Sequence, residues 1–428
     1  MSAEPDATVL TRTQAAARQR PGGRRRRWLR RRPARRTMVL IHRWTSLVLG
    51  LLLVMETTSG ALVLFHSEYF RATHSTLYHH TASAHPISTE QALGIVHKAH
   101  PEFPAAWVGA DHGILAVGDP TYTQVYGVDP GNGHINGVSH IVHGPMGFLV
   151  NLHDCGLTCQ GYSGYVSWLN HPVPSLGIGW LKDVVWGSAF LGVLGMMMIL
   201  LAITGIITWW PGIRRMSHGV RVRTKRGRFA RDYDLHNLIG IVAVPFVLMW
   251  GVTGAAFEFP GVEKAWLAIT NGKAPDPNRY TFTANPAPKK APDIGLAEAT
   301  AAAQQRQPGR VGYVALPQPA ADYYSVSIVG PHAPYRYRGF YSGDVTVYVD
   351  GHDASHVSVV DSGRGEPVAN TFYAKFFEAS HFGWMVNGWW RIVWFIFGMA
   401  PLALAVTGVS TWLFRRKTKR TRQKAQPA

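Results

Sequence analysis

The sequence is poor in cysteine and in acidic residues, and each shortage narrows what the protein can be. Its two cysteines, Cys155 and Cys159, are close neighbours, so they provide at most one short disulfide loop, which an oxidising compartment favours. A structural zinc site needs four ligands, and this pair alone does not supply them. The 25 acidic residues face 43 lysines and arginines, a formal net charge of +18. Such a charge suits nucleic acid or a membrane surface, and its placement decides between them.

Four apolar segments are long enough to cross a lipid bilayer as helices, which takes about 20 residues. They lie around residues 41–65, 186–210, 236–258 and 391–414. In lipid, a single apolar segment satisfies its own backbone hydrogen bonds only as a helix. We therefore predict an α-helical membrane protein with four transmembrane helices and the lipid bilayer as its first partner.

Arginine and lysine gather in three clusters, before the first apolar segment, between the second and third, and after the fourth. A four-span topology brings all three clusters to one side of the membrane. The positive-inside rule makes that side cytoplasmic. The charge therefore indicates topology, and no nucleic-acid partner is predicted. We expect a multi-pass protein of the cytoplasmic (inner) membrane with both termini in the cytoplasm.

This topology divides the chain into tails, spans, one cytoplasmic loop and two large extracytoplasmic segments. The predicted boundaries are a disordered basic cytoplasmic tail (1–37), the first span (38–66), an extracytoplasmic domain (67–185), the second span (186–211), a basic cytoplasmic loop (212–234), the third span (235–259), a second extracytoplasmic domain (260–388), the fourth span (389–414) and a basic cytoplasmic tail (415–428).

The two extracytoplasmic segments have the same order of elements. Each contains a helical pattern, at residues 87–103 in one and 293–309 in the other. Short stretches of alternating polarity follow each helix, separated by Gly, Pro and Asp, as is typical of strands. We therefore predict one small α+β domain in each segment.

The spans repeat as well. The same interval of 18 residues separates His42 from Gly60 and His236 from Gly254, and TGIITWW near the end of the second span matches TGVSTWL near the end of the fourth. Parallel repeats imply a pseudo-twofold axis along the membrane normal. We therefore predict two pseudo-symmetric repeats, with His42 and His236 facing each other near the cytoplasmic surface.

A facing pair of histidines predicts haem, because two imidazoles can hold one b-type haem iron from opposite sides. No cysteine or carboxylate accompanies His42 and His236 to indicate a metal site of another type. Gly205 and Gly408, near the cytoplasmic ends of the second and fourth spans, would leave room for a flat macrocycle. Close packing of the helices is the alternative reason for these glycines.

Gly60 and Gly254 would leave similar room near the outer surface, which predicts a second pair of histidines there. His381, just before the fourth span, is the candidate from the second repeat. Its partner in the first repeat is open at this point, because several histidines flank the first two spans: His143, His153, His171 and His66.

These motifs resemble the PepSY-associated transmembrane family, in which spans that begin HRW or LH alternate with PepSY domains. The matching pieces lie between about residues 38 and 415 and are His42-Arg43-Trp44, Ser59-Gly60, Leu152-His153, Thr204-Gly205, Leu235-His236, Thr253-Gly254 and Thr407-Gly408. The family includes di-haem ferric-siderophore reductases. The resemblance implies two haem b groups per chain, PepSY-like domains outside the membrane, and His153 as the partner of His381.

The sequence suggests two alternative roles for each of three further residues, Arg43, Arg391 and Glu56. Arg43 and Arg391 are placed where haem propionates would lie, although arginines at this depth also anchor helices to lipid headgroups. Glu56 is a carboxylate well inside the first span, where an ionisable group indicates function. It would carry a proton or form a hydrogen bond to a neighbouring helix.

The resulting hypothesis is an enzyme, a haem-dependent reductase that passes electrons outward to a ferric siderophore or similar iron chelate. The sequence has no GxGxxG fingerprint and no cytoplasmic segment large enough to bind a flavin or nicotinamide. Quinol or a separate cytoplasmic reductase is therefore the expected electron donor. The alternatives are a non-enzymatic PepSY protein that regulates a peptidase or binds a ligand or metal, and a permease for the chelate.

Overall fold

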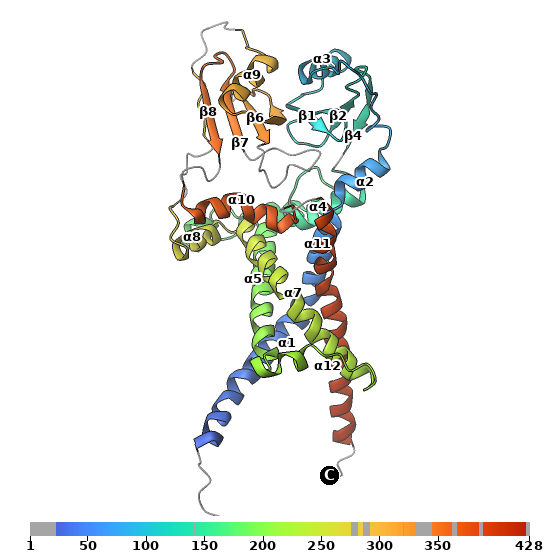
Figure 1. Cartoon of the computed structure of the whole chain (residues 1–428), viewed down its shortest axis with the longest axis vertical. Coiled ribbons are helices and arrows are strands. Elements are labelled where there is room, and N and C mark those ends of the chain that lie inside the picture. The colour runs from blue at the N-terminus through green and yellow to red at the C-terminus, as the bar shows by residue number, and fades with distance from the viewer. Residues whose placement is uncertain are drawn as a thin grey trace, which may run out of the picture.

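The computed structural model of the protein describes residues 23–140, 142–274, 281–285, 292–319, 321–329, 345–361, 366–384 and 388–424. It has three layers, which are a bundle of long helices, a set of shorter helices across one end of the bundle, and a β-sheet beyond them (Figure 1). We call the end of the bundle next to the sheet the sheet end. The opposite end, which carries the clusters of arginine and lysine, is called the basic end.

The bundle is built from α1 (Gly23–Val63), α5 (Trp186–Trp209), α7 (Arg228–Glu258) and a fourth span that runs from α11 (Arg391–Gly398) into α12 (Ala400–Lys424). In the described part of the chain, four segments are long and apolar enough to cross a membrane: Arg35–Val63, Trp186–Trp209, Arg228–Glu258 and Gly388–Thr418. The four predicted spans are thus confirmed. Both α1 and α7 pack against α5 and α12, so α1 and α7 lie on a diagonal of the bundle.

The helix that contains the first span begins earlier than predicted. Helix α1 starts at Gly23, so residues 23–37 are helical where we expected a disordered tail, although the apolar span itself starts at Arg35; the rest of that tail lies outside the described residues. Arginine and alanine are good helix formers. A helix that is already nucleated by the span extends readily through them, and Pro33 is the one residue of this stretch that opposes the extension.

Small residues set the distance between neighbouring spans in the same way in both halves. A side chain on Gly195 of α5 would meet the backbone of Gly251 and Ala255 on α7, at 3.0 and 2.8 Å. A side chain on Gly398 of α11 would meet Ala61 on α1, at 3.0 Å. Such close contacts between backbones are how apolar helices gain packing energy in lipid.

Short helices lie across the sheet end of the bundle (Figure 1). Helix α4 (Gly144–Cys155) packs against α1 and α5, and α10 (Val368–Phe382) packs against α7 and α8 (Pro260–Ile269). Both α4 and α10 end at a glycine with positive φ, Gly156 (56°) and Gly383 (73°). A disulfide joins Cys155 at the end of α4 to Cys159. The remaining short helices are α2 (His66–Thr73), α6 (Met216–Gly219) and 3₁₀ turns at Ser167–Asn170, Gly179–Leu181, Ile213–Arg215 and Gly388–Trp390.

The two predicted α+β segments form one continuous antiparallel sheet. Its strand order is β4-β3-β2-β1-β5-β6-β7-β8. The strands are β1 (Trp107–Asp111), β2 (Ile114–Gly118), β3 (Val125–Val128), β4 (Ile135–Ser139), β5 (Arg310–Ala315), β6 (Tyr323–Val329), β7 (Val345–Asp350) and β8 (Val357–Asp361). The predicted helices are confirmed as α3 (Thr89–Ala99) and α9 (Leu296–Arg306).

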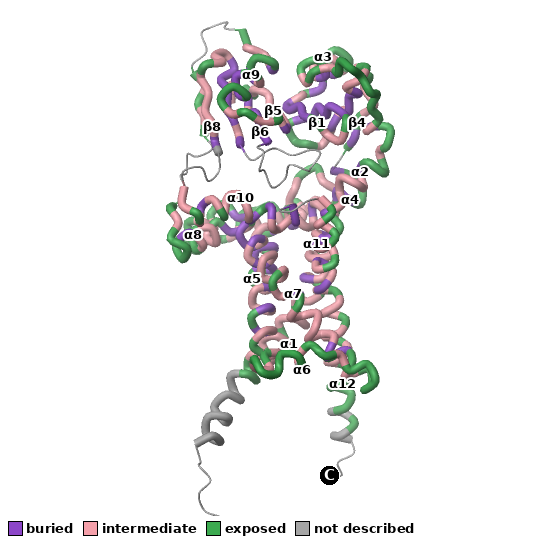
Figure 2. The backbone as a smooth tube through the Cα atoms, in the orientation of Figure 1, coloured by how far each residue is buried: buried purple, intermediate pink, exposed green. Residues whose placement is uncertain are grey.

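The seam between the two halves is the pairing of β1 with β5, in which Val108 lies opposite Val314. Gly109 permits this approach, because a side chain there would meet the Gly312 carbonyl and Tyr313 at 3.0 Å. One core runs across the seam under α3 and α9, and includes the fully buried Val108 and Val326 (Figure 2). The sequence predicted one small α+β domain in each segment, whereas the two segments share one sheet and one core.

Each half of the sheet has an almost fully buried aspartate at the end of its third strand, Asp129 directly after β3 and Asp350 as the last residue of β7. Asp129 accepts hydrogen bonds from the backbone amides of Thr81 (2.9 Å) and Gly131 (2.8 Å) and from the Thr81 hydroxyl (2.7 Å). Asp350 accepts from the backbone amides of His352 (2.9 Å) and Asn285 (2.6 Å). The two carboxylates fasten equivalent turns to the chain segments that precede the two half-sheets.

Candidate functional site

Two histidines face each other inside the bundle near the basic end. His42 lies on α1 and His236 lies on α7, the two diagonal helices, and their ring centroids are 6.4 Å apart. The rings are perpendicular, with an interplanar angle of 90°. We call His42 and His236 the basic-end pair.

The ring orientation of His42 is fixed by α5. Its Nδ1 lies 3.2 Å from the Leu201 carbonyl and 3.0 Å from the Thr204 hydroxyl. A carbonyl only accepts, and the Thr204 hydroxyl already donates to the Leu200 carbonyl at 2.7 Å. The hydrogen of the imidazole is therefore on Nδ1, which leaves the lone pair of Nε2 available to a ligand.

The same arrangement fixes His236 against α12. Its Nδ1 lies 3.1 Å from the Leu404 carbonyl and 3.1 Å from the Thr407 hydroxyl. The Thr407 hydroxyl donates to the Ala403 carbonyl at 2.8 Å. Nδ1 is again the donor, so both histidines of the basic-end pair present Nε2.

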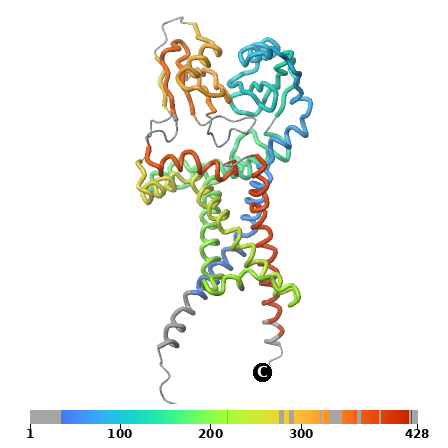
Figure 3. The backbone as a smooth tube through the Cα atoms, in the orientation of Figure 1, coloured from blue at the N-terminus to red at the C-terminus, as the bar shows by residue number. Residues whose placement is uncertain are grey.

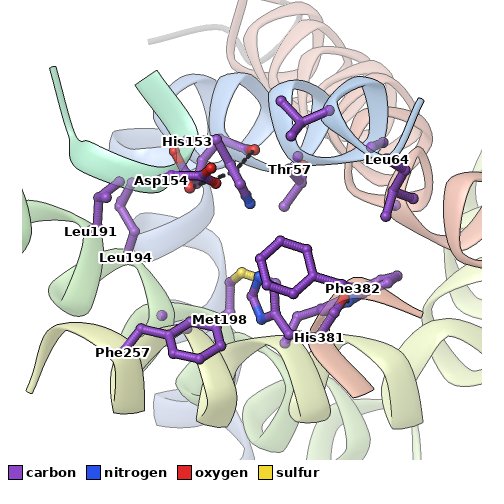
Figure 4. A pocket seen from close by; sticks show the side chains of 18 of the residues that line it. Thr57, Leu64, His153, Asp154, Leu191, Leu194, Met198, Phe257, His381 and Phe382 are labelled. Carbon is purple, nitrogen blue, oxygen red and sulfur yellow. Dashed lines mark hydrogen bonds and ion pairs between the residues drawn. The ribbon is translucent and has the colours of Figure 1, made fainter. Parts of the chain in front are cut away.

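A second pair of histidines lies at the sheet end of the bundle. His153, in the last turn of α4, and His381, in the last turn of α10, have ring centroids 6.0 Å apart and an interplanar angle of 37°. Both line a cavity of about 420 Å³, into which their rings point (Figure 4). The walls come from all four spans, and they include Gly60, Met198, Gly254 and Trp394. We call His153 and His381 the sheet-end pair.

His381 is held by α7 through two contacts. Its Nδ1 lies 2.7 Å from the Thr253 hydroxyl, which donates to the Met249 carbonyl at 2.8 Å and therefore accepts from the ring. The indole of Trp250 donates to the His381 backbone carbonyl at 3.0 Å. These bonds place the end of α10 over α7 and direct Nε2 of His381 away from α7.

His153 differs from the other three histidines in its partner. Its Nδ1 lies 2.8 Å from the Glu56 carboxylate and 3.0 Å from the Glu56 backbone carbonyl. Both side chains are only 15% exposed. Nδ1 is once more the donor, but here it donates to a charged acceptor.

The two histidines of the sheet-end pair have opposite pKa shifts. Burial, together with the charge of the neighbouring His153, lowers the pKa of His381 to about 3. Burial also acts to lower the pKa of His153, but the Glu56 carboxylate outweighs it and raises that pKa to about 9. A metal ion would displace the proton that His153 holds, because a histidine ligand must be deprotonated at the nitrogen that binds.

Each of the four predicted glycines lies against the ring of one histidine. The nearest atom to a methyl group built on the glycine is a ring carbon in every case, at 3.4 Å for Gly205 and His42, 3.3 Å for Gly408 and His236, and 3.6 Å for Gly254 and His381. At Gly60 a methyl group would overlap the ring of His153. The sequence predicted space for a macrocycle at these glycines, and the structure shows that imidazole rings occupy the space next to them.

Both pairs fit a metal-centred group with two axial imidazoles. If one metal is bound by two Nε2 atoms at about 2.0 Å each, the ring centroids are about 6.4 Å apart. The observed separations are 6.4 and 6.0 Å. Among the described residues there is no group of three or more His, Cys, Asp or Glu that could hold a metal ion. A two-histidine site of this kind suits haem, whose porphyrin supplies the other ligands to the iron.

The other histidine candidates lie in different surroundings. His143 precedes the first turn of α4, with its ring 5.7 Å from that of His140. The Nδ1 of His171 lies 2.9 Å from the Trp168 carbonyl. His66 begins α2 and its ring contacts Phe70. His153 is thus the candidate that the structure places opposite His381.

The two arginines proposed for propionates differ in their surroundings. Arg43 is half-buried beside His42 on α1. Arg391 donates to the Leu64 carbonyl at 2.9 Å and to both oxygens of the Glu68 carboxylate. The charge of Arg391 is already balanced by Glu68, which disfavours the predicted propionate role.

Sequence reasoning gave no role to the hydroxyls that orient the rings. Thr204, Thr407 and Thr253 each precede one of the four glycines and each contact the Nδ1 of a histidine. The sequence feature that could have indicated this role is the Thr-Gly pair, which recurs at Thr204-Gly205, Thr253-Gly254 and Thr407-Gly408. Three carboxylates besides Glu56 also line the sheet-end cavity and were not singled out: Asp154, Glu258 and Glu378.

The fold defines a multi-pass membrane protein with two histidine pairs stacked along its bundle. The family model of the PepSY-associated TM region matches residues 39–415. The chain therefore belongs to the PepSY-associated transmembrane family, as its motifs indicated. No curated protein sequence matches it.

Proposed function

We propose that the protein is a membrane b-type di-haem oxidoreductase that passes electrons across the membrane and reduces ferric iron in a siderophore or similar chelate. The observation that carries the proposal is the presence of two histidine pairs in one bundle, with all four Nδ1 atoms held by protein acceptors. Four Nε2 atoms are thereby left to serve as axial ligands. Haem b, when bound, supplies a one-electron carrier at each pair.

The direction of transfer follows from the charge on the spans. The clusters of arginine and lysine lie at the basic end, which the positive-inside rule assigns to the cytoplasm. The basic-end pair would then receive electrons, and the sheet-end pair would deliver them on the outer side of an inner membrane. Both termini would be cytoplasmic.

Donor and acceptor are inferred from chemistry. Quinol or a separate cytoplasmic reductase would supply the electrons. One electron converts one ferric ion to ferrous, so a quinol, which yields two electrons and two protons, would reduce two. The oxygen donors of siderophores are hard ligands that bind the ferrous ion far less tightly, so reduction releases the iron.

The first test is the haem content of the purified full-length protein. We expect a b-type reduced-minus-oxidised spectrum and two haems per chain. His143→Ala is a matched control, because it removes a histidine outside both pairs and should leave two haems in place. A wild-type protein without haem would overturn the proposal and favour a binding protein or a permease.

The second test addresses the substrate. Protein reduced with dithionite, freed of excess reductant and mixed anaerobically with ferric chelates should be reoxidised, with ferrous iron trapped by a ferrous-specific chelator. One ferrous ion should form for each electron lost. Reduced haem that persists with every ferric chelate, but is reoxidised by ferricyanide, would refute ferric-chelate reduction and leave the haem sites intact.

A further inference from the structure

The internal repeat is broken at one position next to the sheet-end pair. Glu56 lies four residues before Gly60 on α1, and Trp250 lies four residues before Gly254 on α7, so the two occupy equivalent places. Trp250 donates to the backbone of His381. Glu56 accepts from the ring of His153. One half of the protein therefore has a neutral indole where the other half has a carboxylate.

This difference makes one of the four histidines chemically distinct. His42, His236 and His381 donate from Nδ1 to neutral carbonyl or hydroxyl oxygens. His153 alone among these four donates to a carboxylate, at 2.8 Å. The Glu56 backbone carbonyl also accepts a hydrogen bond from the buried Ser59 hydroxyl, at 2.8 Å.

A carboxylate on the far nitrogen makes an imidazole a more basic ligand and fixes its orientation. A more basic ligand donates more electron density to the metal and stabilises the higher oxidation state, so the reduction potential falls. We propose that Glu56 is a positioning residue that acts through His153 and holds the reduction potential of the sheet-end haem below that of the basic-end haem. This inference rests on the proposed function.

A low potential at the sheet-end site is the useful direction for a ferric-chelate reductase. Siderophores stabilise ferric iron, so their ferric complexes are hard to reduce and require a strong reductant. Electrons would collect at the basic-end site and reach the sheet-end site against a potential difference. Oxidation of the sheet-end haem by the ferric chelate would then drive the transfer of these electrons.

The test is a potentiometric titration of the purified full-length protein and its Glu56→Gln variant. Glutamine keeps an oxygen that accepts from Nδ1 but removes the charge, so the ring keeps its hydrogen bond. The wild type should titrate in two steps. We expect only the lower step to shift upward in Glu56→Gln, with two haems retained. The His42→Ala/His236→Ala variant assigns the steps, because the step that it keeps belongs to the sheet-end pair.

The matched control is Glu258→Gln. Glu258 lines the same cavity as Glu56 but lies on α7. If the hydrogen bond to His153 sets the potential, Glu258→Gln should shift the lower step much less than Glu56→Gln. Equal shifts in the two variants would assign the effect to the total charge of the cavity and overturn the inference.

The remaining outcomes of the titration also decide whether Glu56 sets the reduction potential of the sheet-end haem. Two haems with unchanged potentials in Glu56→Gln would refute the role of Glu56. If Glu56→Gln loses the sheet-end haem, Glu56→Asp, which keeps the charge, should restore that haem at a low potential. Failure of Glu56→Asp to do so would assign Glu56 to helix packing alone. None of these results affects the proposed function, which fails only if the wild type lacks haem or does not reduce ferric chelates.

Discussion

The basic-end and sheet-end pairs share a geometry but are built from different parts of the molecule. The basic-end pair belongs to two spans, α1 and α7, and each ring is held by the next span in the bundle. The sheet-end pair is carried by α4 and α10, which lie across the bundle, and its rings reach back to α1 and α7. The basic-end site is therefore symmetric in its partners, whereas the sheet-end site combines a carboxylate with a hydroxyl. The two pairs thus have similar ring separations but different hydrogen-bond partners.

The largest expected effect comes from removing one pair at a time. His42→Ala/His236→Ala and His153→Ala/His381→Ala should each reduce the haem content from two per chain to one, because the proposed function assigns one haem iron to each pair. The pyridine haemochrome assay on purified protein measures the ratio. The haem that remains should differ in potential between the two variants. Unchanged haem in either double variant would show that its pair is not a ligand pair.

Substitutions of Gly60 and Gly254 test whether the space beside His153 is smaller than the space beside His381. A methyl group on Gly60 would overlap the His153 ring, whereas one on Gly254 would lie 3.6 Å from the His381 ring. Gly60→Ala should displace His153, costing about 1–3 kcal/mol of stability and most of the sheet-end haem. Gly254→Ala should be neutral or stabilising by up to about 1 kcal/mol, because alanine favours helix.

Haem content and the midpoint of thermal unfolding, compared between Gly60→Ala and Gly254→Ala, measure this difference. Gly205→Ala provides a third reference at 3.4 Å from His42. If all three variants kept two haems, the close contact between Gly60 and His153 would not be needed for haem binding.

Replacing either threonine that contacts the basic-end pair, Thr204 or Thr407, should have a smaller effect, and the two effects should be equal. Thr204→Val and Thr407→Val each remove one of two Nδ1 acceptors and leave a carbonyl, that of Leu201 or Leu404, in place. Each should cost about 1 kcal/mol and alter the basic-end potential slightly, without loss of haem. Thermal unfolding and potentiometry measure both effects. Unequal effects would show that the basic-end site is less symmetric than its contacts.

The smallest effect concerns the half-sheets at low pH. Burial acts to raise the pKa of Asp129 and Asp350, but hydrogen bonds outweigh it and lower both below the ordinary value of 3.8. Their stabilisation is therefore fully present above pH 3.8 and is lost as the pH falls through the lower folded values. Asp129→Asn and Asp350→Asn should each make the unfolding midpoint of the sheet less dependent on pH below 4. A slope equal to that of the wild type would contradict this.

The sequence predicts what is local or repeated. The spans follow from apolar length, the strands from alternation, and the pairing of His42 with His236 from one repeated interval of 18 residues. His381 follows from the same symmetry. Its partner does not, because four histidines flank the first two spans and only the motif Leu152-His153 separated them.

Contacts between distant segments were beyond the sequence. The α4 and α10 helices were not predicted: each ends at a glycine, but neither has a side-chain N-cap or an amphipathic spacing strong enough to stand out beside a span. The bond between Glu56 and His153 joins residues 97 positions apart, and the seam between β1 and β5 joins strands from different halves. Neither leaves a mark in local periodicity, since both depend on how the bundle brings its segments together.

The seam between β1 and β5 also has a consequence for how the protein is made. Arg310 at the start of β5 follows Trp107 at the start of β1 by 203 residues. At a synthesis rate of roughly 5–20 residues per second, the edge of β1 waits roughly 10–40 s for its partner. An unpaired edge invites pairing with other chains, and short edge strands reduce that hazard. β1 has only five residues. Its brevity would protect the newly made first half from aggregation until the second half emerges to close the sheet.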